Sequence, residues 1–386
     1  MTLESMQAVW RVVVWRLPLA RTPRPRRLAM TANGPPVVGA ILAIDLGKYT
    51  SVACEYRGAS DGVRFHTVRT RREELCRLIE RLRPGVVVIE ACAMAGWVHD
   101  LCGERGVCCR VANTASEAWK FRHSKRKTDR DDARRLVDLT ALGQLPTVAI
   151  PAKAVRERRA LIAVRQTLVG RRTTVRNRIR GILLGQGLPV PVGHRAWTEL
   201  GRAGLAQLGR PLAACSAEDL WRGLLDLALT ELGQVEALVA ATEAKLNAQG
   251  RDDAATRLLQ TVPGVGPRTA EAIVAHLDDP HRFRTGKQVS AYAGLVPRQY
   301  QSGESDRRGR ITKRGSVVLR SLLVECAWAL VRYNAWGRAT YRHLTRGGPA
   351  RRKVAIVALA RRLLVRCWAM LRDGTAWRVG PAAAVH

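Results

Sequence analysis

The chain has 386 residues, which at about 150 residues per domain suggests two or three domains. It carries 65 Lys and Arg against 32 Asp and Glu, a net charge of +33, and this excess argues for a polyanionic partner such as nucleic acid. No apolar run approaches about 18 residues, which excludes a transmembrane helix. The nine cysteines form no C-x-x-C pair, so we expect reduced thiols, no zinc site and a cytoplasmic, nucleoid-associated protein.

Residues 1–36 stand apart from the rest of the chain. The segment "WRLPLARTPRPRRLAMTANGPP" is rich in Arg and Pro, and its apolar part is short and broken. We expect a disordered basic arm rather than a targeting peptide, with Met30 as an alternative start of translation.

Residues 37–148 predict an α/β domain. The strands "ILAID", "TSVACEY" and "VRFHTVR" come first, and the amphipathic helix "RREELCRLIERL" and the buried strand "VVVIE" follow. A helix at 96–104, the strand "VCCRVA" and the helix "KTDRDDARRLVDLTALG" complete the series. This order of elements is typical of a ribonuclease-H-like, or RuvC-like, fold.

Four acids of this domain are placed to share one site. Asp45 ends the first strand and Glu90 ends the fourth, so both can point from the same edge of the sheet. Asp129 and Asp132 are three residues apart and share a helix face. Acids that converge in this way repel one another unless cations neutralise them, and oxygen-only ligands suit Mg²⁺ or Mn²⁺. Asp131 is the alternative to Asp132 as the fourth ligand.

Basic residues lie immediately before these helical acids. The segment "RHSKRKTDR", residues 122–130, includes Arg126 and Lys127, which we expect to contact a nucleic-acid backbone. A solvated loop is the plainer interpretation of the same residues.

Residues 149–252 predict two long helices with heptad-like apolar seams. The first seam contains Leu161, Val164, Leu168, Val175 and Ile182, and the second contains Leu225, Ala228, Leu232, Val235, Val239, Thr242 and Leu246. These coiled-coil helices pair either with each other or with a second copy of the chain. Arg172 and Arg176 belong to an arginine-rich polar face of the first helix that predicts nucleic-acid binding.

Residues 253–372 predict a mainly α-helical C-terminal domain, followed by a tail at 373–386. "LLQTVPGVGPRTAEAIVAHL" is typical of a helix-hairpin-helix, in which Gly264 and Gly266 let backbone N–H groups approach a phosphate. A plain helical hairpin with a glycine turn is the alternative.

Ser302 lies in the glycine-containing loop "QYQSGES", next to a cluster of basic residues. On composition alone such a serine is a turn residue, because a nucleophile needs a base or cations to activate it. The expected nucleic-acid contacts in this region are Arg298, Arg307, Arg308, Arg310, Lys313 and Arg314.

Taken together, these segments resemble the DEDD-type insertion-sequence transposases that carry a C-terminal catalytic serine, the bridge-RNA-guided recombinases. The matching pieces, in the family's order, are "AIDLGK", "VVIEAC", "KTDRDDA", "VPGVGPRTA", "AYAGLVPRQYQSG" and "GRITKRG". They cover about residues 38–370. Where family members often have Ser-Ser-Gly-Gly, this chain has Gln301-Ser302-Gly303-Glu304.

The resemblance implies a mechanism. A RuvC-like domain would hold metal on Asp45, Glu90, Asp129 and Asp132. Ser302 would form a covalent serine–DNA intermediate. The metal site and the serine that act together would come from different subunits of a homodimer or homotetramer. Donor and target DNA would pair with a structured guide RNA from the element's flank.

Two other functions are compatible with the same residues. A RuvC-like, metal-dependent junction endonuclease would use the four acids and water, leaving the Ser302 region as a binding loop. A non-catalytic nucleic-acid-binding remnant of an element would use neither site.

Overall fold

The computed structural model describes residues 39–58, 61–114, 116, 128–190, 192–302 and 305–378. The chain forms two compact units, divided between Ile150 and Pro151. The expected basic arm, Arg126 and Lys127 lie outside the described residues. Among the described helices, none combines the length and the apolar character that a membrane span requires.

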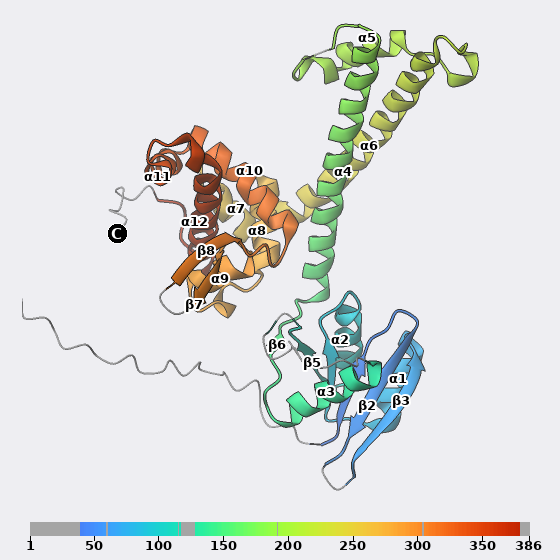
Figure 1. The fold of residues 1–386 in the computed structure, drawn as a ribbon, viewed down its shortest axis with the longest axis vertical. Helices are drawn as coiled ribbons and strands as arrows, with labels where there is room; N and C mark the ends of the chain where they lie inside the picture. Colours follow the sequence, from blue (N-terminus) through green and yellow to red (C-terminus); the bar gives the residue numbers. More distant parts are fainter. Residues whose placement is uncertain are drawn as a thin grey trace, which may run out of the picture. The chain divides into compact units, whose positions relative to one another are not determined.

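The first unit is a mixed sheet covered by helices on both faces (Figure 1). The sheet has the order β3-β2-β1-β4-β5-β6; β1 pairs in parallel with β4 and β4 with β5, and the other neighbours are antiparallel. The elements in chain order are β1 (Ile41–Asp45), β2 (Thr50–Tyr56), β3 (Val63–Arg69), α1 (Arg72–Leu82), β4 (Val86–Glu90), α2 (Ala95–Glu104), β5 (Cys108–Ala112), α3 (Asp129–Ala141) and β6 (Thr147–Val148). The predicted order of strands and helices is confirmed, with β6 as an addition.

The alternation of side chains along β1 and β4 separates two cores. Leu42 and Ile44 face α1 and α2 in one core, whereas Ile41 and Ala43 face α3 in the other. Each core is closed by apolar residues of its helices, among them Leu136 of α3. Both strands are therefore buried on both sides, which explains why they are continuous apolar runs in the sequence.

The second unit contains a pair of long helices and a helical bundle. Its elements are α4 (Lys153–Gly185), α5 (Glu199–Leu208), α6 (Leu220–Arg251), α7 (Ala254–Gln260), α8 (Pro267–Leu277), α9 (Gly286–Tyr292), β7 (Pro297–Ser302), β8 (Ser305–Ile311), α10 (Val317–Tyr333), α11 (Ala335–Thr345) and α12 (Arg352–Asp373). The C-terminal part is mainly helical, as predicted. The segment around Ser302, however, is not a loop but part of an antiparallel β7–β8 hairpin.

Helices α4 and α6 pack against each other along their length (Figure 1). All the predicted apolar positions of α6 except Thr242 are buried. The predicted seam of α4 is only partly right, because Val164 is 50% exposed while Ile162, Ile179 and Leu183 are buried beside Val175. Between Ile162 and Val175 no residue of α4 is fully buried; Leu168 is half-buried there, and Arg165 and Arg171 form ion pairs with α6.

The thiols are free, with no disulfide among the described cysteines. Five of them are buried, as expected: Cys54, Cys76, Cys102, Cys326 and Cys367. Cys92, two residues after β4, and Cys108, the first residue of β5, are exposed, and Cys109 and Cys215 are half-buried, contrary to the expectation of buried thiols.

Candidate active site

Asp45 and Glu90 lie side by side at one edge of the first unit's sheet. The parallel pairing of β1 and β4 sets Ile44 opposite Ile89, so the acids that follow are neighbours at the carboxyl ends of both strands. Asp45 continues the alternation of Ile41 and Ala43, so its side chain points to the face that α3 covers, and Glu90 does the same on β4. Both carboxylates are half-buried.

The first turn of α3 brings Asp129 and Asp132 to this same face. The buried stripe of α3 contains Ala133, Leu136 and Val137, and Asp129 and Asp132 extend this stripe toward the start of the helix. Asp132 is half-buried and Asp129 is exposed. The helix therefore presents both acids on the side where it packs against the sheet.

Asp131 has a different environment from Asp132. The Thr128 hydroxyl accepts a hydrogen bond from the Asp131 N–H at 3.3 Å and donates one to the Asp131 carboxylate at 2.6 Å. This reciprocal arrangement caps the helix. It engages the Asp131 side chain on the exposed side of α3, away from the sheet.

Arg135, which the sequence did not single out, links the strand acids to the helix acids. Burial lowers the pKa of its guanidinium, and the nearby charges of Asp132 and Glu90 oppose that shift. The charge of a carboxylate on α3 and that of one on β4 thus both act on Arg135, in agreement with the placement of these two acids at the same end of the sheet. Its position three residues after Asp132 is the only sequence signal for this role.

The donor atoms at this edge suit a hard divalent cation, because all of them are carboxylate oxygens. The expected convergence of the four acids is not complete, however. In the part of the chain that the structure describes, no group of three or more His, Cys, Asp or Glu side chains is arranged to hold a metal ion.

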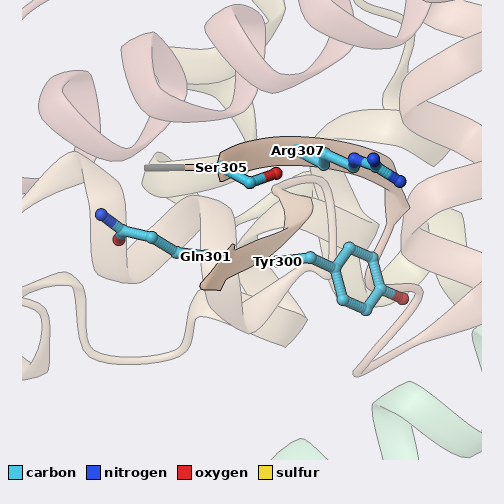
Figure 2. Close-up of a pocket in the computed structure, with 4 residues that line it drawn as sticks. All are labelled: Tyr300, Gln301, Ser305 and Arg307. Atoms are coloured by element: carbon cyan, nitrogen blue, oxygen red, sulfur yellow. The ribbon is translucent and has the colours of Figure 1, made fainter. Parts of the chain in front are cut away.

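In the second unit, Ser302 is the last residue of β7 and pairs with Ser305 at the start of β8. The side chain of Ser302 lies outside the described residues, as do residues 303–304. Tyr300, Gln301, Ser305 and Arg307 line a hollow of about 370 Å³ on this hairpin (Figure 2). Figure 2 shows these four side chains coming from both strands.

At the base of the hairpin, backbone hydrogen bonds join the segment before β7 to the segment after β8. The Thr312 N–H donates to the Val296 carbonyl at 2.8 Å, and the Lys313 N–H donates to the Gly294 carbonyl at 3.1 Å. Gly294 and Gly315 have positive φ, and a Cβ on either would lie within 2.1 Å of a backbone oxygen. Only glycine fits at these two positions. The chain segments that enter and leave the hairpin can therefore pass close to each other at its base.

The basic residues expected around Ser302 are exposed on or next to this hairpin where their side chains are described. They are Arg298, Arg307, Arg310, Lys313 and Arg314. The side chain of Arg308 lies outside the described residues.

The two expected glycines of the helix-hairpin-helix have different surroundings. Gly264 lies against α10, where a Cβ would come within 3.4 Å of the Ala329 backbone, and its carbonyl accepts from the Cys326 thiol at 3.2 Å. Gly266 precedes α8 and has no atom within 4 Å of a Cβ position. The open side of the turn, where a phosphate could approach, is therefore at Gly266.

Arg176 of α4 is engaged inside the helix pair. Its guanidinium donates to Glu236 of α6 at 2.6 Å and lies over the Trp197 ring at 4.9 Å from the centroid. Such contacts favour a structural role for Arg176, whereas Arg172 has no ion pair with a described residue. The predicted arginine rail on α4 is thus interrupted by pairs with α6.

Known proteins resemble this chain over most of its length. The family model described as "Transposase IS116/IS110/IS902 family" matches residues 256–342, and a model for DEDD transposases of the IS110 type matches residues 42–186. A probable family 20 transposase of Pseudomonas aeruginosa is 34% identical over 317 residues, covering 80% of this chain and 90% of the relative. The transposase for insertion sequence element IS1111A of Coxiella burnetii is 30% identical over 352 residues, covering 88% and 92%.

Proposed function

Because this chain belongs to the IS116/IS110/IS902 family of transposases, we propose that it cuts and rejoins DNA through a covalent serine–DNA intermediate, guided by a structured RNA. Membership makes it a DNA-binding enzyme of phosphoryl transfer whose DEDD domain uses a divalent metal. The covalent intermediate, the RNA and the oligomer are our proposals.

The observation that carries the proposal is that Asp45 and Glu90 end neighbouring parallel strands on the face that α3 covers, while Asp129 and Asp132 lie in the first turn of α3, on the side that packs against this face. Asp45, Glu90, Asp129 and Asp132 would hold the metal ion, which we propose to be Mg²⁺ or Mn²⁺. When bound, such an ion activates and stabilises the oxygens that exchange at phosphorus. Arg135 would keep Glu90 and Asp132 oriented and offset part of their repulsion.

Ser302 is the proposed nucleophile. As its oxygen forms a bond to phosphorus, the bond from phosphorus to one deoxyribose oxygen breaks; the serine loses its hydroxyl proton and the leaving oxygen gains one. A deoxyribose hydroxyl then attacks the phosphoserine bond, which restores the serine and rejoins DNA. The exposed cations of the hairpin, such as Arg307, support this role because they can hold the phosphate and its developing charge.

A structured RNA from the element's flank is the proposed guide, which would read donor and target DNA by base pairing. A net charge of +33 supports this partner, since one chain would have to hold RNA and two DNA segments through their backbones.

A homodimer or homotetramer is the proposed assembly. Helix α6 supports it, because it carries four leucines that are about half exposed, Leu220, Leu224, Leu227 and Leu238, the first three of them spaced by four and three residues. A second copy of the chain would bury these leucines, and the two sites that act on one DNA strand would then come from different subunits.

A covalent-adduct assay tests the proposal. The purified protein is incubated with Mg²⁺, the flanking RNA and end-labelled junction DNA, and a denaturing gel separates protein-linked from free DNA. We expect an adduct that disappears in Ser302→Ala and in EDTA, and that Asp45→Asn reduces by at least about a hundredfold.

Ser305→Ala is the matched control, because Ser305 pairs with Ser302 across the hairpin and its side chain is one of those that line the hollow. It should keep most of the adduct. Loss of the adduct in Ser305→Ala alone would move the nucleophile to Ser305, and cleaved DNA without any adduct would support a water-using junction endonuclease instead.

A further inference from the structure

The C-terminal helices contain a long stretch with no acidic residue. Residues 326–372 have eleven Lys or Arg and no Asp or Glu. This stretch includes the end of α10, all of α11 and nearly all of α12. It is separate in sequence from the hairpin cations and from the helix-hairpin-helix.

Five of these cations gather where α11 turns into α12, a region that we name the α11–α12 corner. It comprises Arg342, Arg346, Arg351, Arg352 and Lys353, all of them exposed. α11 ends at Thr345, a short 3₁₀ turn spans Pro349–Arg351, and α12 starts directly after it. The two helices and this turn pack on one another, so the five charges belong to one compact surface.

No carboxylate of the described chain neutralises the corner. None of its five cations forms an ion pair with any described residue. Asp373, the next acid along the chain, lies at the other end of α12, roughly 30 Å away at about 1.5 Å per residue, and pairs with Arg372 at 2.7 Å. Glu325, the preceding acid, lies in the middle of α10.

The arginines that hold the second unit together are arranged differently. On α4, Arg165 pairs with Glu243 at 2.5 Å and Arg176 pairs with Glu236 at 2.6 Å. In both pairs the arginine meets a glutamate on the facing helix, and Arg158 of α4 likewise pairs with Asp253 at 2.7 Å. Moreover, Arg352 and Lys353 stand in the first turn of α12, where cations oppose the helix dipole. The corner's charges therefore do not serve the stability of the free chain.

We propose that the α11–α12 corner binds the sugar-phosphate backbone of duplex DNA. Four of its five cations are arginines, whose planar guanidinium matches phosphate oxygens. Long, exposed, flexible side chains suit backbone contacts, which position a duplex without reading its sequence. DNA is the partner that the family implies. The proposal goes beyond the proposed function, since it requires neither the serine chemistry nor the guide RNA.

Salt-dependent binding tests this surface. The full chain and the triple variant Arg346→Gln, Arg352→Gln, Lys353→Gln are titrated against a fluorescent duplex from the element's end, in EDTA so that no cleavage occurs. Removing one cation that neutralises a phosphate should reduce the slope of log K against log salt by about 0.9, so we expect a reduction of roughly 2–3 and at least about tenfold weaker binding at low salt.

The matched control removes the same charge elsewhere in the second unit. Arg195, Lys245 and Arg251 are exposed and lie outside the corner; replacing all three with Gln should reduce the slope by less than about 1. Thermal melting verifies that both triple variants are folded. Ser302→Ala should keep the wild-type slope, so failure of the serine mechanism is separable from failure of the corner.

Two results would overturn the proposal. One is an equal loss of slope in the corner variant and the control, which would mean that only net charge matters. The other is an unchanged slope for duplex DNA in the corner variant together with weaker binding of the element's RNA, which would assign the corner to RNA.

Discussion

Replacing Gly315 with Ala should loosen the base of the hairpin that carries Ser302. Gly315 has φ +76° and Gly347 has φ +75°, but their surroundings differ. A Cβ on Gly315 would lie 2.1 Å from the Tyr292 carbonyl oxygen, whereas a Cβ on Gly347 would meet nothing within 4 Å. Comparing Ala substitutions at these two positions therefore separates the cost of a left-handed backbone from the cost of steric overlap.

The magnitudes follow from these contacts. Left-handed backbone costs an Ala about 1 kcal/mol, which is the whole expected loss of unfolding free energy in Gly347→Ala. In Gly315→Ala the Cβ or the Tyr292 backbone must also shift by roughly 1 Å, and such overpacking costs about 1–3 kcal/mol more. We therefore expect a total loss of about 2–4 kcal/mol for Gly315→Ala.

Urea titration followed by tryptophan fluorescence measures both variants. A loss in Gly315→Ala no greater than in Gly347→Ala would refute the reasoning, because the overlap would then have no cost. In the adduct assay, a displacement of about 1 Å at the hairpin base should reduce the yield of Gly315→Ala by about a hundredfold, while Gly347→Ala keeps most of it.

Three further predictions concern the acids and arginines of the two units. Asp132→Asn should lower strand-exchange activity by at least about a hundredfold, whereas Asp131→Ala should lower the unfolding free energy by about 1 kcal/mol and keep activity, as measured by adduct yield and thermal melting. Burial raises the pKa of Asp253, but hydrogen bonds from Arg158 and Thr256 outweigh burial and hold it below its usual value. The stability that Asp253 contributes is thus present at neutral pH and lost as pH falls through that lowered pKa, so Asp253→Asn should cost about 2–3 kcal/mol at pH 7 and flatten the acid limb of a stability–pH profile. Arg176→Met should weaken the α4–α6 pair by about 2 kcal/mol in urea titrations and leave the salt slope of DNA binding unchanged, whereas a reduced slope would restore Arg176 to the nucleic-acid surface.

For the first unit, the sequence predicts the order of strands and helices and the placement of the acids at the strand ends. Its central strands are buried on both faces, so they are unbroken apolar runs that end abruptly at Asp45 and Glu90. Helix periodicity likewise sets Asp129 and Asp132 on one face. The role of Arg135 could not be predicted. Helix α3 contains three arginines, Arg130, Arg134 and Arg135, that the sequence does not distinguish, and only the packing of the helix on the sheet brings Arg135 toward the acids.

The second unit was harder to predict where polar contacts replace apolar ones. The strands "PRQYQS" and "SDRRGRI" have no apolar face, so no alternation indicated a hairpin at 297–311. On α4 the apolar pattern favoured Val164, but Arg165 and its neighbours bridge to α6 through glutamates, and the contact surface follows those pairs. Sequence patterns of hydrophobicity do not report interfaces of this kind.

The long helix pair leaves the helical bundle and returns to the same place. α4 starts at Lys153 and α6 ends at Arg251, and the Arg158–Asp253 ion pair at 2.7 Å joins the outgoing and returning chain at the root. The helices have 33 and 32 residues and are each roughly 50 Å long at about 1.5 Å per residue. Ile162 and Leu246 belong to the core of the bundle, so the length of the arm is set by the turns beyond these two residues, and an equal change in both helices there would alter its reach and leave the contacts of the root in place.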